Sequence, residues 1–317
     1  MSAAWKPDSW RGKPSQQMAE YADKEAAAAV FDKLGKLPPL VQPAEVDRLR
    51  TVLAAAAAGE RFIVQGGDCA ERFIDCEADR LEAQLKLLLQ MGAIVEKSTG
   101  LPSVNIARIA GQYGKPRSKP TEMHPEMGEI MSFKGDNING YEAKERKWDC
   151  QRLLEGYYHS SATLNYLRGL VSAGNLSAMS QVQVDFMKDE AATKVAKAIS
   201  SQKPSAEFAE FFTSHEGMQL DLEEALTRKS GSAYYNLGCH MLWIGDRTRQ
   251  LDGGHVEYFR GIANPVGCKV GPSMKNDELQ QLVKILNPDK IEGKLVPSPC
   301  REQARCGRVA SAAQAAA

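Results

Sequence analysis

The sequence of 317 residues has no long apolar run, no apolar leader and no net charge. No stretch approaches the roughly 18 consecutive apolar residues that a membrane-spanning helix needs, and the start, MSAAWKPDSWRGKPSQ, lacks the apolar core of a secretory signal. The 40 basic and 40 acidic side chains balance to +0, which argues against a nucleic-acid partner. We therefore expect a soluble cytoplasmic protein (or a plastid protein in a photosynthetic organism) that binds small anions through local cationic clusters.

Paired-cysteine motifs and nucleotide-binding glycine motifs are absent as well. The seven cysteines form no CxxC pair and no metal-finger spacing. An odd number of cysteines without a secretory signal indicates reduced thiols in a reducing compartment. The glycines at Gly66-Gly67 and at Gly111 and Gly114 match neither the Rossmann fingerprint nor the P-loop. No dinucleotide site is expected.

Apolar patterning predicts helices that alternate with short strands. Helical spacing of apolar residues predicts helices over 23–34, 44–58, 79–97 and 151–173. Short apolar runs bounded by turn residues predict strands over 61–65, 104–109, 209–213, 240–245 and 267–271. This alternation is typical of a parallel α/β sheet. The length suits one large α/β barrel or two ordinary domains.

Polar or charged residues stand at the carboxyl ends of the predicted strands. They are Asp68-Cys69, Arg108, Ser214-His215-Glu216, Asp246-Arg247 and Lys269. In a (β/α)8 barrel the functional groups lie at these strand ends. Five such ends in one chain indicate a catalytic or binding face.

Residues 107–118, ARIAGQYGKPRS, form the most informative of these ends. The predicted strand carries Arg108, and a glycine-punctuated loop then presents Lys115, Arg117 and Ser118. An arginine fork and a lysine point charge beside a hydroxyl can hold phosphate oxygens. A solvated basic loop explains the same residues equally well.

The other strand ends also allow two interpretations each. Cys69 could be a nucleophile or a metal ligand, or a small buried apolar residue. Arg247 could clamp a carboxylate or phosphate, or belong to a structural ion-pair network in which Arg249 pairs with Asp252 or Asp246. Lys269 in an apolar run needs an anion, which favours a ligand contact. His215 and Glu216 could coordinate a metal or act in acid–base chemistry, or have a structural role.

Long motifs give the chain a clear resemblance. FIVQGGDCAERF, ARIAGQYGKPRS, FKGDNING, FFTSHEGMQLDLEEALTR, LWIGDRTRQLDGGHVEYFRGIANPVGCKVGPSM and ILNP resemble the class II (plant-type) 3-deoxy-D-arabino-heptulosonate 7-phosphate (DAHP) synthases, from about residue 5 to about residue 295. The resemblance implies an α/β fold, a (β/α)8 TIM-type barrel with an N-terminal helical extension. It also implies condensation of phosphoenolpyruvate with erythrose 4-phosphate, with release of phosphate, as the first shikimate-pathway step towards chorismate and aromatic amino acids.

The resemblance also assigns roles to residues. It implies a divalent metal, usually Mn2+ or Co2+, with Cys69 as a ligand. The positions that match phosphoenolpyruvate-binding residues are Arg108, Asp246, Arg247 and Lys269. The positions that match the erythrose 4-phosphate site are Lys115, Arg117 and Ser118. In the reaction, the metal polarises the aldehyde of erythrose 4-phosphate and the enol carbon of phosphoenolpyruvate attacks it, while Arg and Lys hold the two substrates in line.

Three departures from the family pattern stand out. Asp246-Arg247 replaces the usual Glu-Arg. The stretch 174–210 is short, and QVQVDFM, residues 181–187, is the only candidate there for the third barrel strand. After residue 288 the strand–helix rhythm stops, so we expect a frayed or foreign terminus, with the last barrel units missing.

These departures divide the chain and limit its expected activity. We expect an N-terminal extension over 1–59, a partial barrel over 60–295 and a non-family tail over 296–317.

The family's remaining His, Glu and Asp metal ligands lie in the missing part, and Arg301 has the spacing but not the neighbours of the last substrate arginine. A frameshift or mis-spliced gene is one explanation. The alternative to a synthase is an inactive fragment that binds anions or a full-length subunit. We expect little activity from the chain alone, and a homo-oligomer is possible.

Overall fold

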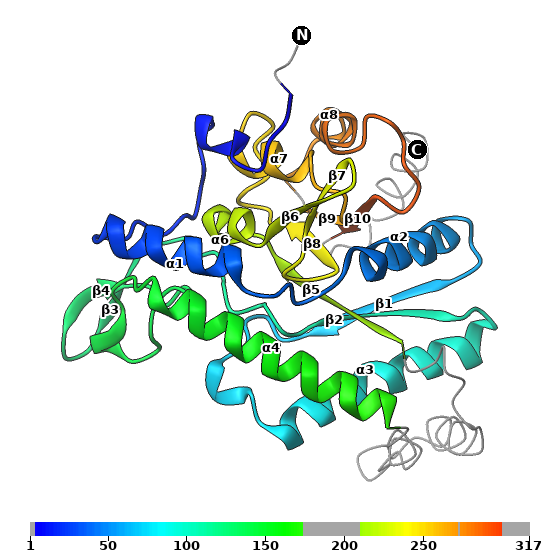
Figure 1. Cartoon of the computed structure of the whole chain (residues 1–317), viewed down its shortest axis with the longest axis horizontal. Helices are drawn as coiled ribbons and strands as arrows, with labels where there is room; N and C mark the ends of the chain where they lie inside the picture. Colours follow the sequence, from blue (N-terminus) through cyan, green and yellow to red (C-terminus); the bar gives the residue numbers. More distant parts are fainter. Residues whose placement is uncertain (1–3, 174–209, 272, 300–317) are drawn as a thin grey trace.

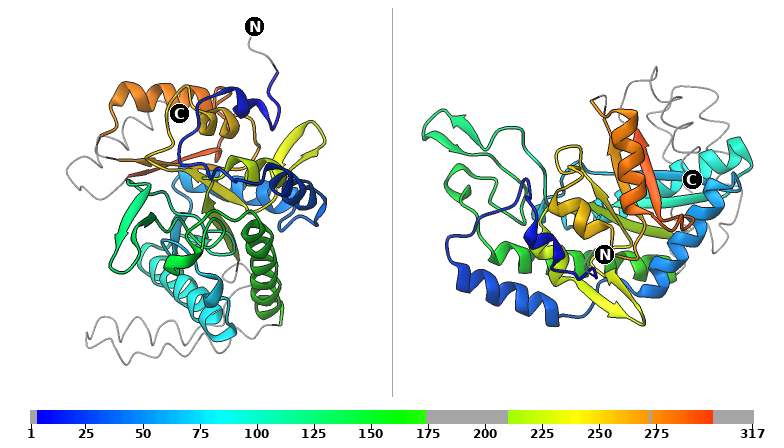
Figure 2. Two further views of the ribbon diagram at one scale, coloured as in Figure 1. Left: turned by 90° about the vertical axis from the view of Figure 1, so that its left-hand side faces the viewer. Right: turned by 90° about the horizontal axis from the view of Figure 1, so that it is seen from above.

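A six-stranded parallel sheet forms the centre of the computed structural model, which describes residues 4–173, 210–271 and 273–299. The strand order is β1 (Phe62–Gly67), β2 (Ser103–Arg108), β5 (Phe211–Glu216), β8 (Met241–Ile244), β9 (Val266–Val270) and β10 (Leu295–Pro299). The sheet is curled into a half-barrel (Figures 1 and 2). The predicted parallel α/β sheet is confirmed. Within the described ranges β1 and β10 do not pair with each other. The structure therefore shows a half-barrel, in line with the partial barrel expected from the sequence, and it does not confirm a full (β/α)8 barrel.

The third position in the sheet belongs to β5. Strand β2 pairs with β5 directly, with Ile106 opposite Phe212. The sequence offered only residues 181–187 for a third strand, and that segment lies outside the described residues.

Strand β10 corrects the expectation that no barrel unit follows residue 288. It pairs in parallel with β9, and Leu295 lies opposite Val266. Leu295 packs against the cluster that includes Val266 and Cys268. Residues 300–317, including Arg301, lie outside the described residues.

Helices cover both faces of the sheet. On one face α3 (Ala78–Thr99) packs Leu85 and Leu89 near Ala107 of β2, and α4 (Gln151–Ser172) joins the same cluster. Farther along the sheet, α7 (Gly254–Phe259) and α8 (Asn276–Leu286) pack on β8 and β9 (Figure 1). The short helix α6 (Leu220–Ala225) follows β5 and contacts α1 (Lys24–Lys36).

Helix α2 (Pro43–Ala57) fills the amino-terminal half of the opposite, concave face. Its Leu49 packs against Val104 and Ile106 of β2. Because side chains alternate along a strand, Val104 and Ile106 share their face with Arg108. The helix therefore leaves the carboxyl end of this face open for a site.

Local sequence signals explain where the helices begin and end. The Asp23 side chain accepts a hydrogen bond from the Ala26 amide and starts α1. A capping box between Gln42 and Glu45 starts α2. Gly100 ends α3 in the left-handed conformation with φ 73°.

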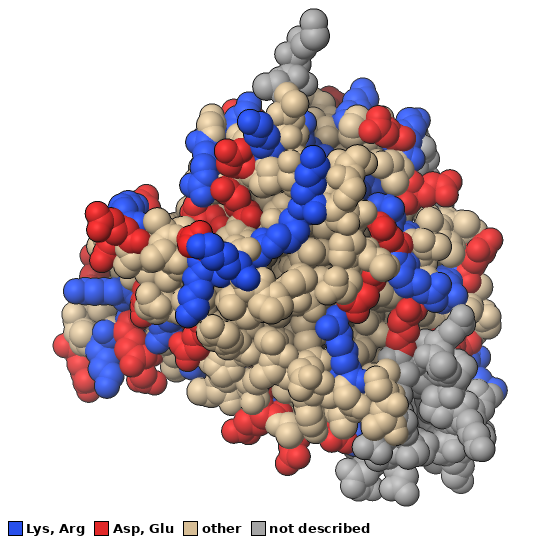
Figure 3. Space-filling view, in the orientation of Figure 1, with Lys and Arg blue, Asp and Glu red and all other residues tan. Residues whose placement is uncertain are grey.

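Two hairpins extend from the half-barrel: β3 (Thr121–His124) with β4 (Gly128–Met131), and β6 (Thr227–Ser230) with β7 (Ala233–Asn236). Across the described part of the chain, no helix combines the length and the apolarity needed to cross a membrane. Basic and acidic side chains are interspersed over the face in Figure 3. This mixture agrees with the zero net charge.

Lys294, just before β10, gives the fold a testable pH dependence. Its ammonium group is buried and donates to the carbonyls of Asn264, at 2.7 Å, and Ile262. Burial, with a smaller contribution from Arg50, lowers the pKa of Lys294 to about 7. Since the unfolded chain keeps the ordinary pKa near 10.4, folding releases a proton between these values, and this residue's contribution to stability rises with pH from about 7 to about 10.

We expect Lys294→Met to be less pH-dependent than the parent chain. As the pH falls from 10 to 7, the free energy of unfolding of the parent should decrease by ~3 kcal/mol more than that of the variant. Urea unfolding at several pH values measures the difference. The exposed Lys284→Met is the control, and equal pH dependence of both variants would contradict the prediction.

Candidate functional site

A cluster of cationic and aromatic side chains lies at the carboxyl end of the concave face. Arg108 ends β2, Glu216 ends β5, Trp243 lies in β8 and Lys269 in β9. The Arg108 guanidinium lies 4.8 Å from the Trp243 ring centroid, and Lys269 Nζ lies 5.6 Å from it. Three strands thus bring two cations onto one indole ring, and a fourth places a carboxylate beside them.

Glu216 is the anion that meets Lys269. Lys269 Nζ donates to Glu216 Oε2 at 2.9 Å, and Trp243 Nε1 donates to the same oxygen at 3.2 Å. The expectation that a lysine in an apolar run needs an anion is met inside the protein. The other oxygen, Glu216 Oε1, is buried without a hydrogen-bond partner among the described residues, so it can accept from a bound molecule or water.

Arg108 is the cation that remains available to a ligand. Its Nη2 donates to the Cys69 carbonyl at 3.2 Å, and its Nε is buried without a partner in the described part of the chain. None of the ion pairs found among the described residues includes Arg108. A guanidinium with donors to spare, beside a lysine, suits a carboxylate or a phosphate.

Glu71 fixes the loop that follows β2. Its buried carboxylate accepts from the backbone amides of Ala110, at 2.9 Å, Gly111, at 3.1 Å, and Gln112, at 2.6 Å. Its own amide donates to the Gln112 carbonyl at 2.8 Å. Burial raises the pKa of Glu71 to about 7, although the three amides oppose the shift. Ala110 takes a left-handed φ of 61°, a strained conformation that this carboxylate stabilises.

Gln112 connects this hydrogen-bonded loop to β5. Its Oε1 accepts from the Glu216 amide at 2.8 Å, and its Nε2 donates to the Gly114 carbonyl at 2.8 Å. The loops after β1 and β2 and the end of β5 are therefore held in one hydrogen-bonded unit. This unit carries Cys69, Arg108 and Glu216.

The predicted phosphate loop lies beside the loop after β8. Arg247 Nη2 donates to Ser118 Oγ at 2.6 Å. Arg117 directs its Nε to the Phe133 carbonyl, while Lys115 is half-buried. The structure thus brings Ser118 and Arg247 together, and Arg117 is engaged in holding the loop.

Asp246 belongs to an ion-pair network. Its Oδ1 accepts from Arg249 Nε at 3.0 Å, and Arg249 also pairs with Glu278 and donates to Ser273 Oγ. The pairing of Arg249 with Asp246 that the sequence allowed is present. Asp246 is exposed and supports the loop from which Arg247 projects.

Cys69 is exposed at the end of β1. The neighbouring Asp68 carboxylate accepts from Gln84 Nε2 at 2.6 Å and lies 3.5 Å from Arg80. Among the described residues, no group of three or more His, Cys, Asp or Glu side chains gathers to hold a metal ion. Cys69 is accessible as one ligand, but these residues do not by themselves fit a complete metal centre.

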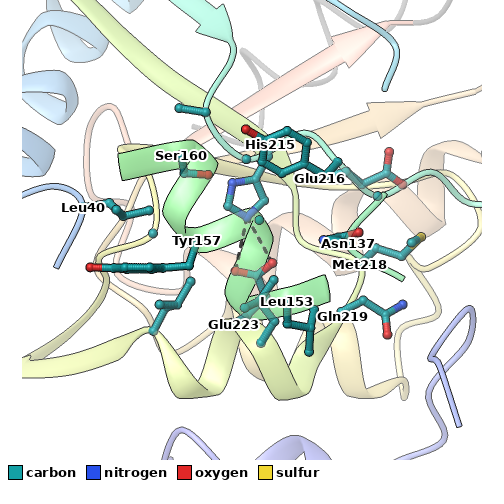
Figure 4. A pocket seen from close by; sticks show the side chains of 18 residues that line it. Leu40, Asn137, Leu153, Tyr157, Ser160, His215, Glu216, Met218, Gln219 and Glu223 are labelled. Carbon is teal, nitrogen blue, oxygen red and sulfur yellow. Dashed lines mark hydrogen bonds and ion pairs between the residues drawn. The ribbon is translucent and has the colours of Figure 1, made fainter. Parts of the chain in front are cut away.

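His215 points away from the cation cluster into the protein. Its Nε2 lies 3.0 Å from Glu223 Oε1, and both side chains are buried (Figure 4). Burial lowers the pKa of His215, but Cys239 and the Glu223 carboxylate outweigh it and raise the pKa well above its usual value. The ring lines a cavity of about 30 Å³, room for about one water molecule. These contacts favour the structural alternative for His215.

Three residues of the site escaped the sequence analysis: Glu71, Trp243 and Glu223. Glu71 and Trp243 stand in the motifs FIVQGGDCAERF and LWIGDRTRQ, so the motifs located them without indicating their partners. Glu223 lies eight residues after His215, and only the turn between β5 and α6 brings the two together.

A curled parallel sheet with a cluster of charged side chains at the carboxyl ends of its strands is the arrangement of α/β-barrel enzymes. The comparisons define the class further. The model of the Class-II DAHP synthetase family matches residues 5–297, and the chain belongs to this family.

Three curated relatives are each named a phospho-2-dehydro-3-deoxyheptonate aldolase. The protein from Neurospora crassa is 41% identical over 92% of this chain and 67% of its own length. The Streptomyces coelicolor protein is 41% identical over 91% and 68%. The Mycolicibacterium smegmatis protein, AroG, is 36% identical over 91% and 66%. The chain therefore spans about two thirds of the length of these relatives.

Proposed function

We propose that this chain catalyses the DAHP synthase reaction, the condensation of phosphoenolpyruvate with erythrose 4-phosphate that releases phosphate and opens the shikimate pathway. The family and the names of the relatives support this function and favour it over the inactive fragment that the sequence left as the alternative. The observation that carries the proposal is that Arg108 and Lys269 approach one Trp243 ring from separate strands. We also propose that the half-barrel is part of a (β/α)8 barrel.

The proposed division of the site follows the strand ends. Arg108 and Lys269 hold the carboxylate and phosphate of phosphoenolpyruvate, with Arg247 and Asp246 at the next loop. Lys115, Arg117 and Ser118 make up the erythrose 4-phosphate end. The hydrogen bond from Arg247 to Ser118 joins the two halves, so binding at one end orients the other.

The chain's own residues supply charge and orientation. Glu216 neutralises Lys269 and keeps it against the indole ring, while Arg108 keeps donors for the substrate. The Glu71 carboxylate fixes the backbone between the two substrate ends. Arg108 and Lys269 are therefore preorganised donors, and such donors stabilise developing charge without rearranging during the reaction.

A divalent metal, Mn2+ or Co2+, belongs to the proposal with Cys69 as the ligand from this part of the chain. Such an ion would polarise the aldehyde oxygen. The described residues offer no complete ligand set for such an ion. Both substrates are phosphorylated and do not cross membranes unaided, so the proposed location is the cytoplasm.

Calorimetric titration with phosphoenolpyruvate, followed by an assay of phosphate release, tests the proposed function. We expect Arg108→Met to weaken phosphoenolpyruvate binding at least roughly tenfold, because a charge-assisted hydrogen bond contributes about 1.5–3 kcal/mol. The control is Arg61→Met. Arg61 lies just before the amino-terminal end of β1, whereas Arg108 lies at the carboxyl end of β2. Phosphate release that requires both substrates and Mn2+ is the expected result for a synthase, and failure of the parent chain to bind phosphoenolpyruvate would refute the proposal.

The second candidate function is an anion-binding barrel unit without activity of its own, which could associate with a full-length subunit. The observation that favours it is the incomplete ligand set around Cys69 in the described residues. Phosphoenolpyruvate binding that depends on Arg108, without any phosphate release, would select this alternative.

A further inference from the structure

Gln17 links the N-terminal segment to the proposed phosphate loop. It lies ahead of α1 in the sequence, yet its side-chain amide meets the backbone of Arg117. Gln17 Nε2 donates to the Arg117 carbonyl at 3.0 Å, and the Arg117 amide donates to Gln17 Oε1 at 3.0 Å. One side chain therefore satisfies both backbone groups of a single loop residue.

The backbone of Gln17 is held as firmly as its side chain. Its carbonyl accepts from Gln219 Nε2 at 2.9 Å and from Lys134 Nζ at 3.4 Å. Gln219 also accepts from the Ala19 amide at 2.8 Å. Gln17 adopts a left-handed φ of 66°, which a residue with a Cβ keeps only where its surroundings impose it.

This arrangement places the loop without occupying the groups that would bind a ligand. Gln17 uses the backbone of Arg117, and the Arg117 side chain is directed to the Phe133 carbonyl. The Ser118 hydroxyl, next along the chain, faces Arg247, and Lys115 is only half-buried. Small shifts of a phosphate-binding loop are costly, because displacement of about 1 Å can reduce activity by about 100-fold.

We propose that Gln17 is a positioning residue for the loop 115–118, and that it sets the affinity for the sugar-phosphate substrate without touching it. The inference rests on the proposed function, because that function assigns the loop to erythrose 4-phosphate. It adds a role for the N-terminal segment, which reaches the site through this amide and supports the loop from outside the barrel.

Three variants of the full chain separate placement of the loop from stability. Gln17→Ala removes both hydrogen bonds to Arg117 and keeps the left-handed strain. Gln17→Gly removes the same bonds but relieves that strain. Gln16→Ala changes the exposed neighbouring glutamine and is the matched control.

We expect Gln17→Ala and Gln17→Gly to bind erythrose 4-phosphate roughly tenfold more weakly in calorimetry, since two backbone hydrogen bonds are lost. Their affinity for phosphoenolpyruvate should fall much less, because Arg108 and Lys269 are untouched and only the hydrogen bond from Arg247 to Ser118 couples the loop to that end. The Gly variant should melt at a higher temperature than the Ala variant and yet bind erythrose 4-phosphate no better. Hydrogen exchange of the Arg117 amide should accelerate in both, and Gln16→Ala should match the parent.

The outcomes also separate the inference from the proposed function. A parent chain that binds neither substrate refutes the proposed function, while faster Arg117 exchange in the variants would still support the contact. A parent chain that binds both substrates, with variants that bind erythrose 4-phosphate equally well, overturns the role of Gln17. Equal loss of affinity for both substrates overturns it too, because that pattern indicates general disruption.

Discussion

Replacement of Glu71 by alanine is expected to lower the free energy of unfolding by about 4 kcal/mol and to abolish measurable phosphoenolpyruvate binding. The change leaves the amides of Ala110, Gly111 and Gln112 without their acceptor, and each unsatisfied buried donor costs about 1–3 kcal/mol. The loop is also strained at Ala110, with φ 61°, and loses the group that holds it there. Arg108, two residues before Ala110, would lose its placement.

Urea unfolding and calorimetric titration measure the two effects. Glu71→Gln is the informative second variant, because an amide has one acceptor oxygen and presents its own N–H groups to at least one donor. It should fall between the parent and Glu71→Ala in stability. Glu60→Ala, at an exposed position before β1, is the control and should match the parent. If Glu71→Ala bound phosphoenolpyruvate normally, Glu71 would have no part in placing Arg108.

Local pattern predicted most elements of the half-barrel, because periodicity and end signals are properties of neighbouring residues. Helices 79–97 and 151–173 appear as Ala78–Thr99 and Gln151–Ser172. Strand 209–213 appears as Phe211–Glu216. It ends later than predicted because its last residues are polar and are buried by tertiary contacts, such as that of His215 with Glu223 of α6. Apolar pattern could not detect that burial.

Strand β10 was missed for a different physical reason. Its sequence, LVPSP, contains Pro297 and Pro299, and proline cannot donate a hydrogen bond to a neighbouring strand. Proline is tolerated at the edge of a sheet, and β10 occupies an edge in the described part of the chain. The sequence does not reveal which strand lies at the edge, so a segment with two prolines does not show the pattern of a strand.

The candidate site, like the fold, could be predicted from the sequence only in part. Arg108 and Lys269 could be predicted because a charge at the end of an apolar run stands out in one dimension. The partners that give these charges their properties could not. Glu216 lies 53 residues from Lys269 and Gln17 lies 100 residues from Arg117, so only the folded topology brings each pair together.

Lys269→Met is expected to lower the free energy of unfolding by about 2 kcal/mol as well as to remove a proposed ligand of phosphoenolpyruvate. The substitution leaves the Glu216 carboxylate, whose side chain is 2% exposed, without its cation. Breaking a buried ion pair costs about 3–5 kcal/mol. We expect a smaller loss here because the Lys269 side chain is 35% exposed and Trp243 Nε1 still donates to the same carboxylate.

A double-mutant cycle separates the charge effect from the loss of packing. Glu216→Gln with Lys269→Met removes both charges and should recover most of the stability that Lys269→Met loses, giving a coupling energy of roughly 1–2 kcal/mol. The exposed Lys275→Met should unfold like the parent. The double variant should remain unable to bind phosphoenolpyruvate tightly, because the ammonium group is still missing. Restored stability with weak binding would show that Lys269 has two separable roles, whereas a double variant no more stable than Lys269→Met would mean that Glu216 does not depend on this lysine for its burial.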